Sequence, residues 1–177
     1  MHLLRCPAAA RTAAALCAVG LLLPASGAGA QLTVTRVDFA PTVTAKLQEY
    51  GESEGAVVRD AVVTALSGTK TPQLPAGRSV AVTVMDLAPS RLTRKQLNDD
   101  PSLDVVSSKS LGGAELKGEV RDAQQHLLTT VSYRHFPPDI TAASPARDPW
   151  ADARVAIDGF AAKLAAAIRD LASTGAR

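Results

Sequence analysis

Two aspartates occupy equivalent places in two similar stretches, VTRVDFAP at residues 34–41 and VTVMDLAP at residues 82–89. Two carboxylates at one edge of a sheet can bind a divalent cation such as calcium, or share a proton as an acid/base pair. A structural role accounts for the same pattern, because a strand-ending Asp accepts hydrogen bonds from the following amides and Ala-Pro then ends the strand. Asp38 and Asp86 are the strongest acidic candidates for a binding site. No third acidic residue is repeated beside them, so the structural role is favoured.

Histidine chemistry depends on His126 and His135, because the third histidine lies near the N-terminus, at position 2. The two are nine residues apart on one predicted strand, about 30 Å at roughly 3.3 Å per residue, so they cannot share a metal ion. His135 stands at a strand end and is the third candidate binding residue, although a packed or exposed histidine is the commoner case there. The sequence has no compact Ser, His and acid pattern, and no phosphate-binding glycine loop follows a strand. We expect no catalytic triad, no metal site and no cofactor.

Residues 1–30 have the pattern of a secretory signal peptide. Arg5 and Arg11 precede the apolar run at residues 13–23, and small residues follow it. The run is shorter than the roughly 20 residues that cross a bilayer, so we expect cleavage before Gln31 and no transmembrane segment in the mature chain. An uncleaved N-terminal anchor is the alternative. The expected location is the periplasm.

The predicted mature chain, residues 31–177, contains neither Cys6 nor Cys17, and neither stands in a lipid-attachment motif. Without thiols it has no disulfide, so packing must stabilise it. It also lacks Arg5 and Arg11, two of the nineteen basic residues of the chain, which leaves seventeen basic and seventeen acidic residues. A balanced charge argues against a nucleic-acid partner, because phosphate binding needs clustered positive charge.

Three elements must position the two aspartates. Residues 32–38 alternate as a strand, residues 53–68 have helical spacing, and residues 79–86 form the clearest strand of the chain. Two strands joined through a helix in one sheet run parallel, and parallel strands bring their C-terminal ends to the same edge. Asp38 and Asp86 then lie at that edge, but the sequence leaves open whether their strands are immediate neighbours.

The second half of the chain predicts a hairpin and a long helix. The polar loop at residues 88–102 is followed by a possible short strand at 103–107, then by strands 114–121 and 127–136. The linker at residues 137–148 leads to a helix that begins at Asp148 and Pro149. Its apolar stripe repeats every three or four residues and consists of Trp150, Ala153, Ile157, Phe160, Leu164, Ala167 and Leu171.

These elements predict a single α+β domain over residues 31–177. We expect a two-layer sandwich, a mixed four- or five-stranded sheet with two helices packed on one face. A chain of this size buries one core, and with few aromatic residues that core consists mainly of Val, Leu, Ile and Ala.

Two stretches carry a resemblance, EYGESEG at residues 49–55 and QLPAGRSVAVTVMDLAPSR at residues 73–91. They resemble an uncharacterised family of secreted proteobacterial proteins, a domain of unknown function with a signal peptide, a Tyr-Gly loop, Leu-Pro-x-Gly and an Asp-Leu-Ala turn. The matching residues are Tyr50, Gly51, Leu74, Pro75, Gly77, Val80, Val82, Val84, Asp86, Leu87, Ala88 and Arg91. Pro89-Ser90 replaces a single expected glycine. The hairpin and final helix resemble small envelope lipoproteins, without the lipid-anchor cysteine. The resemblance implies an envelope location and brings no catalytic residues.

Two hypotheses of function follow. The favoured one is a periplasmic, non-enzymatic accessory or binding protein of the bacterial envelope. Its partner would be an envelope protein or a second copy, contacted through the C-terminal helix. The alternative is a small hydrolase or cation-dependent enzyme that uses Asp38 and Asp86, with His135 as a further group.

Overall fold

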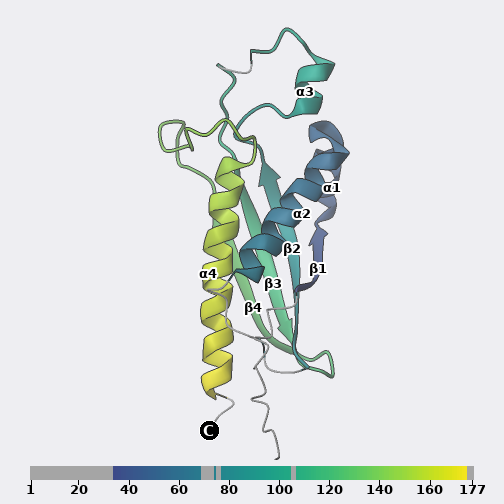
Figure 1. Ribbon diagram of the computed structural model, residues 1–177, viewed down its shortest axis with the longest axis vertical. Coiled ribbons are helices and arrows are strands. Elements are labelled where there is room, and N and C mark those ends of the chain that lie inside the picture. Colours follow the sequence, from purple (N-terminus) through teal and green to yellow (C-terminus); the bar gives the residue numbers. More distant parts are fainter. Residues whose placement is uncertain (1–33, 69–73, 75–76, 105–106, 175–177) are drawn as a thin grey trace, which may run out of the picture.

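The computed structural model describes residues 34–68, 74, 77–104 and 107–174. The predicted signal peptide lies outside the described residues. The strands are β1 (Val34–Phe39), β2 (Ser79–Ala88), β3 (Gly113–Arg121) and β4 (Leu127–His135). The helices are α1 (Pro41–Tyr50), α2 (Glu52–Ser67), α3 (Arg94–Asp99) and α4 (Ala151–Thr174). Figure 1 shows how they are arranged around the sheet.

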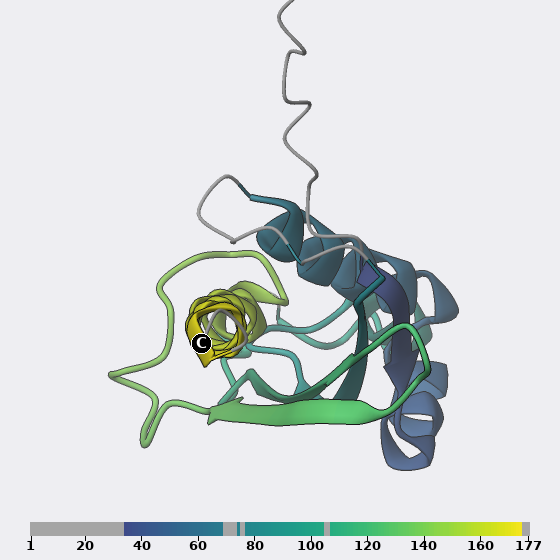
Figure 2. The same ribbon diagram turned by 90° about the horizontal axis from the view of Figure 1, so that it is seen from below.

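The described strands form one four-stranded sheet in the order β1-β2-β3-β4. β1 and β2 pair in parallel, whereas β2–β3 and β3–β4 are antiparallel. α2 and α4 lie together on one side of this sheet (Figure 2). The predicted α+β fold, with a mixed sheet, is therefore confirmed. The predicted helix–strand order around the two aspartates and the predicted hairpin are also present.

The core forms where aliphatic residues of the strands meet α4. Val80, Val82 and Val84 alternate inward and are fully buried, as a strand with one covered face requires. Phe160 of α4 enters above Gly118 of β3, where an added Cβ would lie 2.8 Å from the Phe160 ring. The close approach of helix and sheet thus depends on a residue without a side chain.

The helix α1 was not predicted from the sequence. Pro41 ends β1 as expected, but it also occupies the first turn of the new helix, where the missing N–H of proline has no cost. α1 runs to Gly51, whose φ of 117° lets the chain turn directly into α2. The Ala40 N–H donates to the Val84 carbonyl at 2.9 Å, so α1 begins beside the part of β2 that extends past β1.

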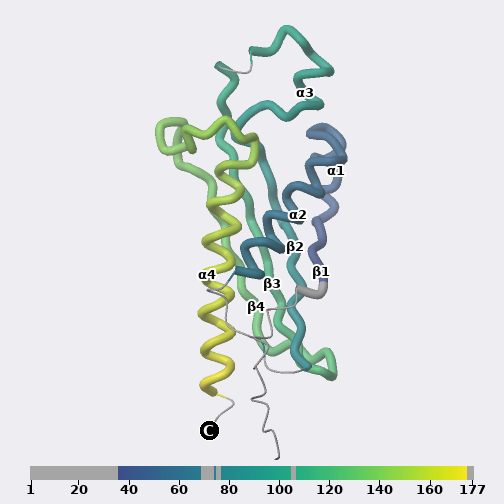
Figure 3. The backbone as a smooth tube through the Cα atoms, in the orientation of Figure 1, coloured from purple at the N-terminus to yellow at the C-terminus, as the bar shows by residue number. Residues whose placement is uncertain are grey.

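The segment between β2 and β3 is largely the polar loop that the sequence predicts, with one short helix in it. The polar loop contains α3, a six-residue helix that begins at Thr93 with a capping box to Gln96. Of the possible strand at 103–107, residues 105–106 lie outside the described residues and the remainder forms no strand. In Figure 3 this segment extends past the end of the sheet, near α1.

Helix α4 begins three residues later than predicted, at Ala151. Asp148 still acts at its start, because its Oδ1 accepts a hydrogen bond from the Trp150 N–H at 3.1 Å. Its Oδ2 pairs with Arg154 Nε at 2.8 Å. Asp148 and Pro149 therefore lie in the turn that leads into α4, and this turn is less regular than the sequence pattern implies.

Candidate functional site

Asp38 and Asp86 lie on neighbouring strands and on the same open face of the sheet, but they are staggered. Asp38 pairs in register with Thr83 of β2. Asp86 lies three residues further along and pairs with Glu115 of β3, after a bulge at Met85. Three strand residues correspond to about 10 Å. The structure therefore makes the two strands adjacent without bringing the two carboxylates together.

Each carboxylate has its own cation. Asp38 Oδ2 is 2.5 Å from Arg36 Nε, and Asp86 Oδ1 is 2.7 Å from Lys46 Nζ. Asp86 Oδ1 also accepts a hydrogen bond from the Leu87 N–H at 2.8 Å, the capping contact that the structural role requires. The Arg36–Asp38 pair is exposed and contributes little to stability.

The titratable groups around Lys46 are held in their usual protonation states. Burial acts to raise the pKa of Asp86, but the hydrogen bonds from Lys46 and the Leu87 amide outweigh it, and the pKa lies below its ordinary value. The hydrogen bond to Asp86 raises the pKa of Lys46. Burial raises the pKa of Tyr50 although nearby Lys46 opposes it. General acid or base catalysis near neutral pH by these groups would need shifts in the opposite directions.

His135 is not part of this cluster. It pairs with Ala114 at the end of β4, one position beyond the pair Glu115–Arg134. Because side chains alternate along a strand, Asp86, Glu115 and Arg134 share the open face, and the His135 side chain leaves on the other face. The structure thus separates His135 from both aspartates. The described residues contain no group of three His, Cys, Asp or Glu side chains able to hold a metal ion.

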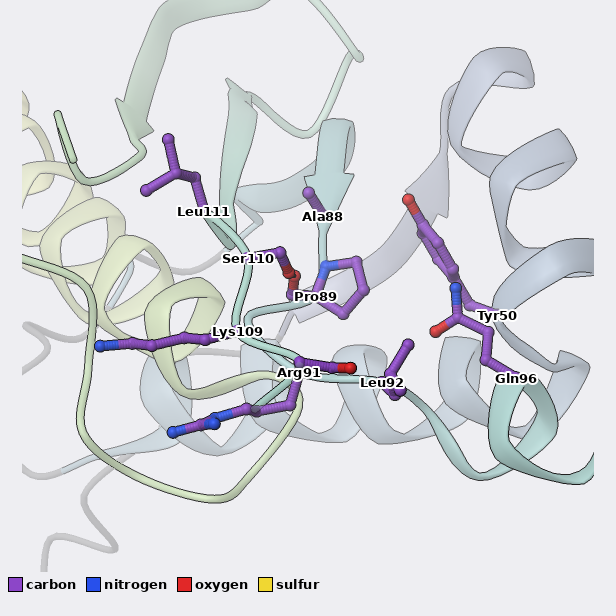
Figure 4. A pocket seen from close by; sticks show the side chains of 10 residues that line it. Tyr50, Ala88, Pro89, Arg91, Leu92, Gln96, Lys109, Ser110 and Leu111 are labelled. Carbon is purple, nitrogen blue, oxygen red and sulfur yellow. The ribbon is translucent and has the colours of Figure 1, made fainter. Parts of the chain in front are cut away.

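Beyond the C-terminal end of β2, four chain segments enclose a pocket of about 350 Å³. Tyr50 comes from the end of α1, residues 88, 89, 91 and 92 follow β2, Gln96 comes from α3, and residues 108–111 precede β3. The close-up in Figure 4 shows these side chains. A volume of 300–1,000 Å³ is usual for small-molecule sites, so this pocket is at the lower end of that range.

The Tyr50 ring packs against the buried residue Trp150. Its ring meets the Trp150 ring edge-on, with centroids 5.9 Å apart, and the Trp150 indole N–H donates to Glu54 Oε2 at 2.6 Å. A second hollow of about 460 Å³ lies between Tyr50, α2 and α3. Tyr50 is therefore a fixed ridge between two hollows. Trp150 is only 2% exposed and belongs to the core, so it is not available as a docking residue.

The base of the pocket is tied by a buried polar network. Ser90 Oγ donates to Asp152 Oδ2 at 2.7 Å, and the Ser144 N–H donates to Asp152 Oδ1 at 2.8 Å. The Ser110 N–H donates to the Ser90 carbonyl at 3.1 Å. Asp152 is 2% exposed, and these bonds compensate its burial. The network joins the start of α4 to the segment that follows β2 and, through the Ser90 carbonyl, to the segment that precedes β3.

No protein-family model and no curated protein matches this chain. Among solved structures, the chain is similar to a minor lipoprotein from Acinetobacter baumannii, at 11% sequence identity and a TM-score of 0.28, over 75% of this chain and 91% of that chain. A TM-score this low carries no argument about function. The resemblance to a secreted proteobacterial family stays a prediction. None of the described helices is long and apolar enough to cross a membrane.

Sequence reasoning did not identify this pocket. Among its lining residues, the sequence patterns single out Tyr50, Ala88 and Arg91 only through the resemblance, and Gln96 falls in the predicted polar loop. The segments are up to 61 positions apart, counting from Tyr50 to Leu111. The available signal was the Tyr50-Gly51 pair, because a glycine with positive φ commonly ends a helix.

Proposed function

We propose that this protein is a periplasmic, non-enzymatic accessory or binding protein of the bacterial envelope, and that it binds through the pocket beside Tyr50. The observation that carries the proposal is the assembly of four distant segments into one pocket beside Tyr50, whose ring packs on Trp150. Binding sites are concave and preformed, with a few fixed polar groups. The proposed periplasmic location rests on the signal-peptide pattern of residues 1–30.

The non-enzymatic part of the proposal is supported by the closed ion pair of Lys46 and Asp86. Asp86 Oδ1 accepts hydrogen bonds from Lys46 Nζ and from the Leu87 N–H. The carboxylate is thus paired with a cation of the protein and caps the end of β2. The two aspartates of the alternative hypothesis are separated along the sheet. Each forms an ion pair with its own cation, Arg36 or Lys46.

A partner protein or a second copy of the chain would meet the outward side of α4. The inward side is occupied by the core, where Phe160 and Ile168 are fully buried. On the outward side Val155 is 48% exposed, between charged residues that suit a solvent-facing or weakly associating surface.

Location is tested by expressing the full chain in a Gram-negative host and fractionating the cells. We expect the protein in the periplasmic fraction with a mass that corresponds to a chain beginning at Gln31. Recovery of the full-length chain in the cytoplasm would contradict the proposed location. Recovery of the full-length chain in the membrane fraction would favour the uncleaved anchor.

The enzymatic alternative is tested with the double variant Asp38→Asn, Asp86→Asn. Asparagine keeps the acceptor for the Leu87 N–H and removes the charge. We expect isothermal titration with Ca²⁺ and Mg²⁺ to give no saturable binding to either protein, and p-nitrophenyl acetate hydrolysis to stay at the buffer rate. Metal binding or hydrolysis by the wild type that the double variant loses would establish the alternative.

A further inference from the structure

We infer that the pocket beside Tyr50 takes a neutral carbohydrate ring. The inference rests on the proposed binding function and adds the chemical class of the ligand. Its basis is a set of polar side-chain atoms around the pocket that have no hydrogen-bond partner within the described part of the chain. These atoms belong to Tyr50, Gln96 and Ser108, and all three groups are uncharged.

The three groups offer matched donors and acceptors. Within the described residues, neither the Tyr50 hydroxyl nor the Ser108 hydroxyl has a protein hydrogen-bond partner. Gln96 uses only its Oε1, which accepts from the Thr93 N–H at 3.0 Å. Its amide NH₂ is therefore left to donate toward the pocket. Hydroxyl groups both donate and accept, so they complement the hydroxyls of a sugar in either direction.

The cations at the rim do not supply an anion site. Lys109 Nζ donates to the carbonyls of Ile140 and Ala143, at 2.9 Å and 3.2 Å. Arg91 and Lys109 both extend away from Tyr50 in the close-up (Figure 4). A phosphate or carboxylate ligand would need a cation directed at it. The neutral groups are therefore the ones that a ligand in the pocket would meet.

The walls of the pocket suit the two-sided character of a sugar ring. Pro89, Leu92 and Leu111 line it together with the Tyr50 ring. Pyranose rings carry hydroxyls at their edges and C–H groups on their faces, so they need apolar contact and hydrogen bonds at once. Tyrosine provides both, because its ring is apolar and its hydroxyl is polar.

An extended peptide is the competing ligand with neutral polar groups. Peptides bind beside a sheet mainly by adding a strand to a free edge. The nearest edge is that of β2, and α1 lies along it, with Lys46 Nζ 3.5 Å from the Leu87 carbonyl. Strand addition is therefore blocked at the pocket, and the carbohydrate is the better match.

The test uses the full mature chain and three probes, N,N′-diacetylchitobiose, maltose and cellobiose. Isothermal titration measures binding, and the emission of Trp150 locates it, because this is the single tryptophan of the chain and its ring contacts Tyr50. Tyr50→Phe removes only the hydroxyl. Gln96→Glu keeps the oxygen that caps α3 and removes the NH₂ donors. Thr130→Ala, at an exposed position of β4, is the matched control.

We expect at least one disaccharide to bind saturably and to change Trp150 emission. Tyr50→Phe and Gln96→Glu should each weaken binding about fivefold, the loss typical of one neutral hydrogen bond. Thr130→Ala should bind like the wild type, and unchanged melting temperatures show that the variants are folded. The inference is overturned if none of the disaccharides binds. It is also overturned if Tyr50→Phe and Gln96→Glu leave the affinity unchanged.

A capped peptide, N-acetyl-trialanine amide, separates this inference from the proposed function. If the peptide binds with the Tyr50 dependence described and the sugars do not, the carbohydrate class is wrong and the pocket remains the binding site. Metal-dependent hydrolysis lost in the Asp38→Asn, Asp86→Asn variant would instead contradict the proposed function itself.

Discussion

Lys46 Nζ lies 2.7 Å from Asp86 Oδ1, and this contact joins α1 to the C-terminal part of β2. The aspartate that the sequence paired with Asp38 is thus paired with a lysine from a helix that the sequence did not predict. The same ammonium group lies 3.5 Å from the Leu87 carbonyl. Lys46 therefore covers the β2 edge where β1 has ended, and Asp86 holds it there.

The Lys46–Asp86 contact predicts a pH dependence of stability. The pKa of Asp86 is lower in the folded chain than its reference value of 3.8. Its contribution is therefore present above that value and is lost as the pH falls through the lower folded pKa. The raised pKa of Lys46 acts at the alkaline end, where its contribution is lost as the pH rises through a folded pKa above 10.5.

We expect Asp86→Asn to melt at a lower temperature than the wild type at neutral pH. The melting temperatures of the two proteins should converge as the pH falls below 3.8 and through the lower folded pKa of Asp86. The other carboxylates with lowered pKa values titrate in both proteins, so the difference isolates Asp86. A gap that stays constant through the acid range would show that the loss comes from the turn and not from the charge.

Long cations also cover the outer edges of the sheet. Lys163 Nζ of α4 donates to the Ser132 carbonyl of β4 at 2.9 Å, and Arg59 Nε donates to the Val37 carbonyl of β1 at 3.3 Å. Free strand edges invite pairing with other chains, and lysine on an edge is a known protection.

Lys163→Met should therefore increase self-association through β4, because methionine keeps the apolar stem and removes the donor. Sedimentation velocity over a concentration series measures this. Arg169→Met, an exposed change on the same helix, controls for the lost charge. Equal sedimentation of both variants would mean that Lys163 does not protect the edge.

Gly159 of α4 lets the helix approach β4. A Cβ at this position would lie 2.5 Å from Tyr133 Cζ, so Gly159→Ala forces the ring to move. Overpacking costs about 1–3 kcal/mol and alanine returns at most about 1 kcal/mol in helix propensity. We expect a net loss of about 1 kcal/mol in the free energy of unfolding, measured by urea titration.

Two control variants make the Gly159 result interpretable. Gly68→Ala meets only ordinary contacts, the nearest at 3.5 Å, and should leave stability within about 0.5 kcal/mol of the wild type. Adding Tyr133→Ala to Gly159→Ala should remove the clash, so the two changes should be strongly non-additive. A stabilised Gly159→Ala protein would refute the packing account.

The buried network at the base of the pocket gives a fourth prediction. Ser90→Ala leaves Asp152 Oδ2, buried in the core, without the donor it has at 2.7 Å. An unsatisfied buried acceptor costs about 1–3 kcal/mol, and thermal unfolding should show a loss of that size. Ser144→Ala keeps its contact to Asp152, which is made by the backbone N–H, and should cost much less. Equal losses would contradict the assigned role of the Ser90 hydroxyl.

The sequence predicted the fold class well because the patterns that decide it are local. Val80, Val82 and Val84 alternate on one strand, and the stripe of α4 repeats within one helix, so the buried face of each element is visible without its partners. α1 was missed for an equally local reason. Pro41 is compatible with the end of a strand and with the first turn of a helix, and only the packing of that helix on β2 separates the two.

The sequence by itself determined the buried faces of the strands and of α4, because these depend on neighbours along the chain. It also determined the parallel relation of β1 and β2, because a helical crossover joins the two strands. The tertiary structure decided that Asp38 and Asp86 are staggered, since the register of two strands and the bulge at Met85 arise from pairing. It also decided that Tyr50, Gln96 and residues 108–111 surround one pocket. Such a site is made by contacts between segments far apart in the chain, and local sequence patterns do not predict those contacts.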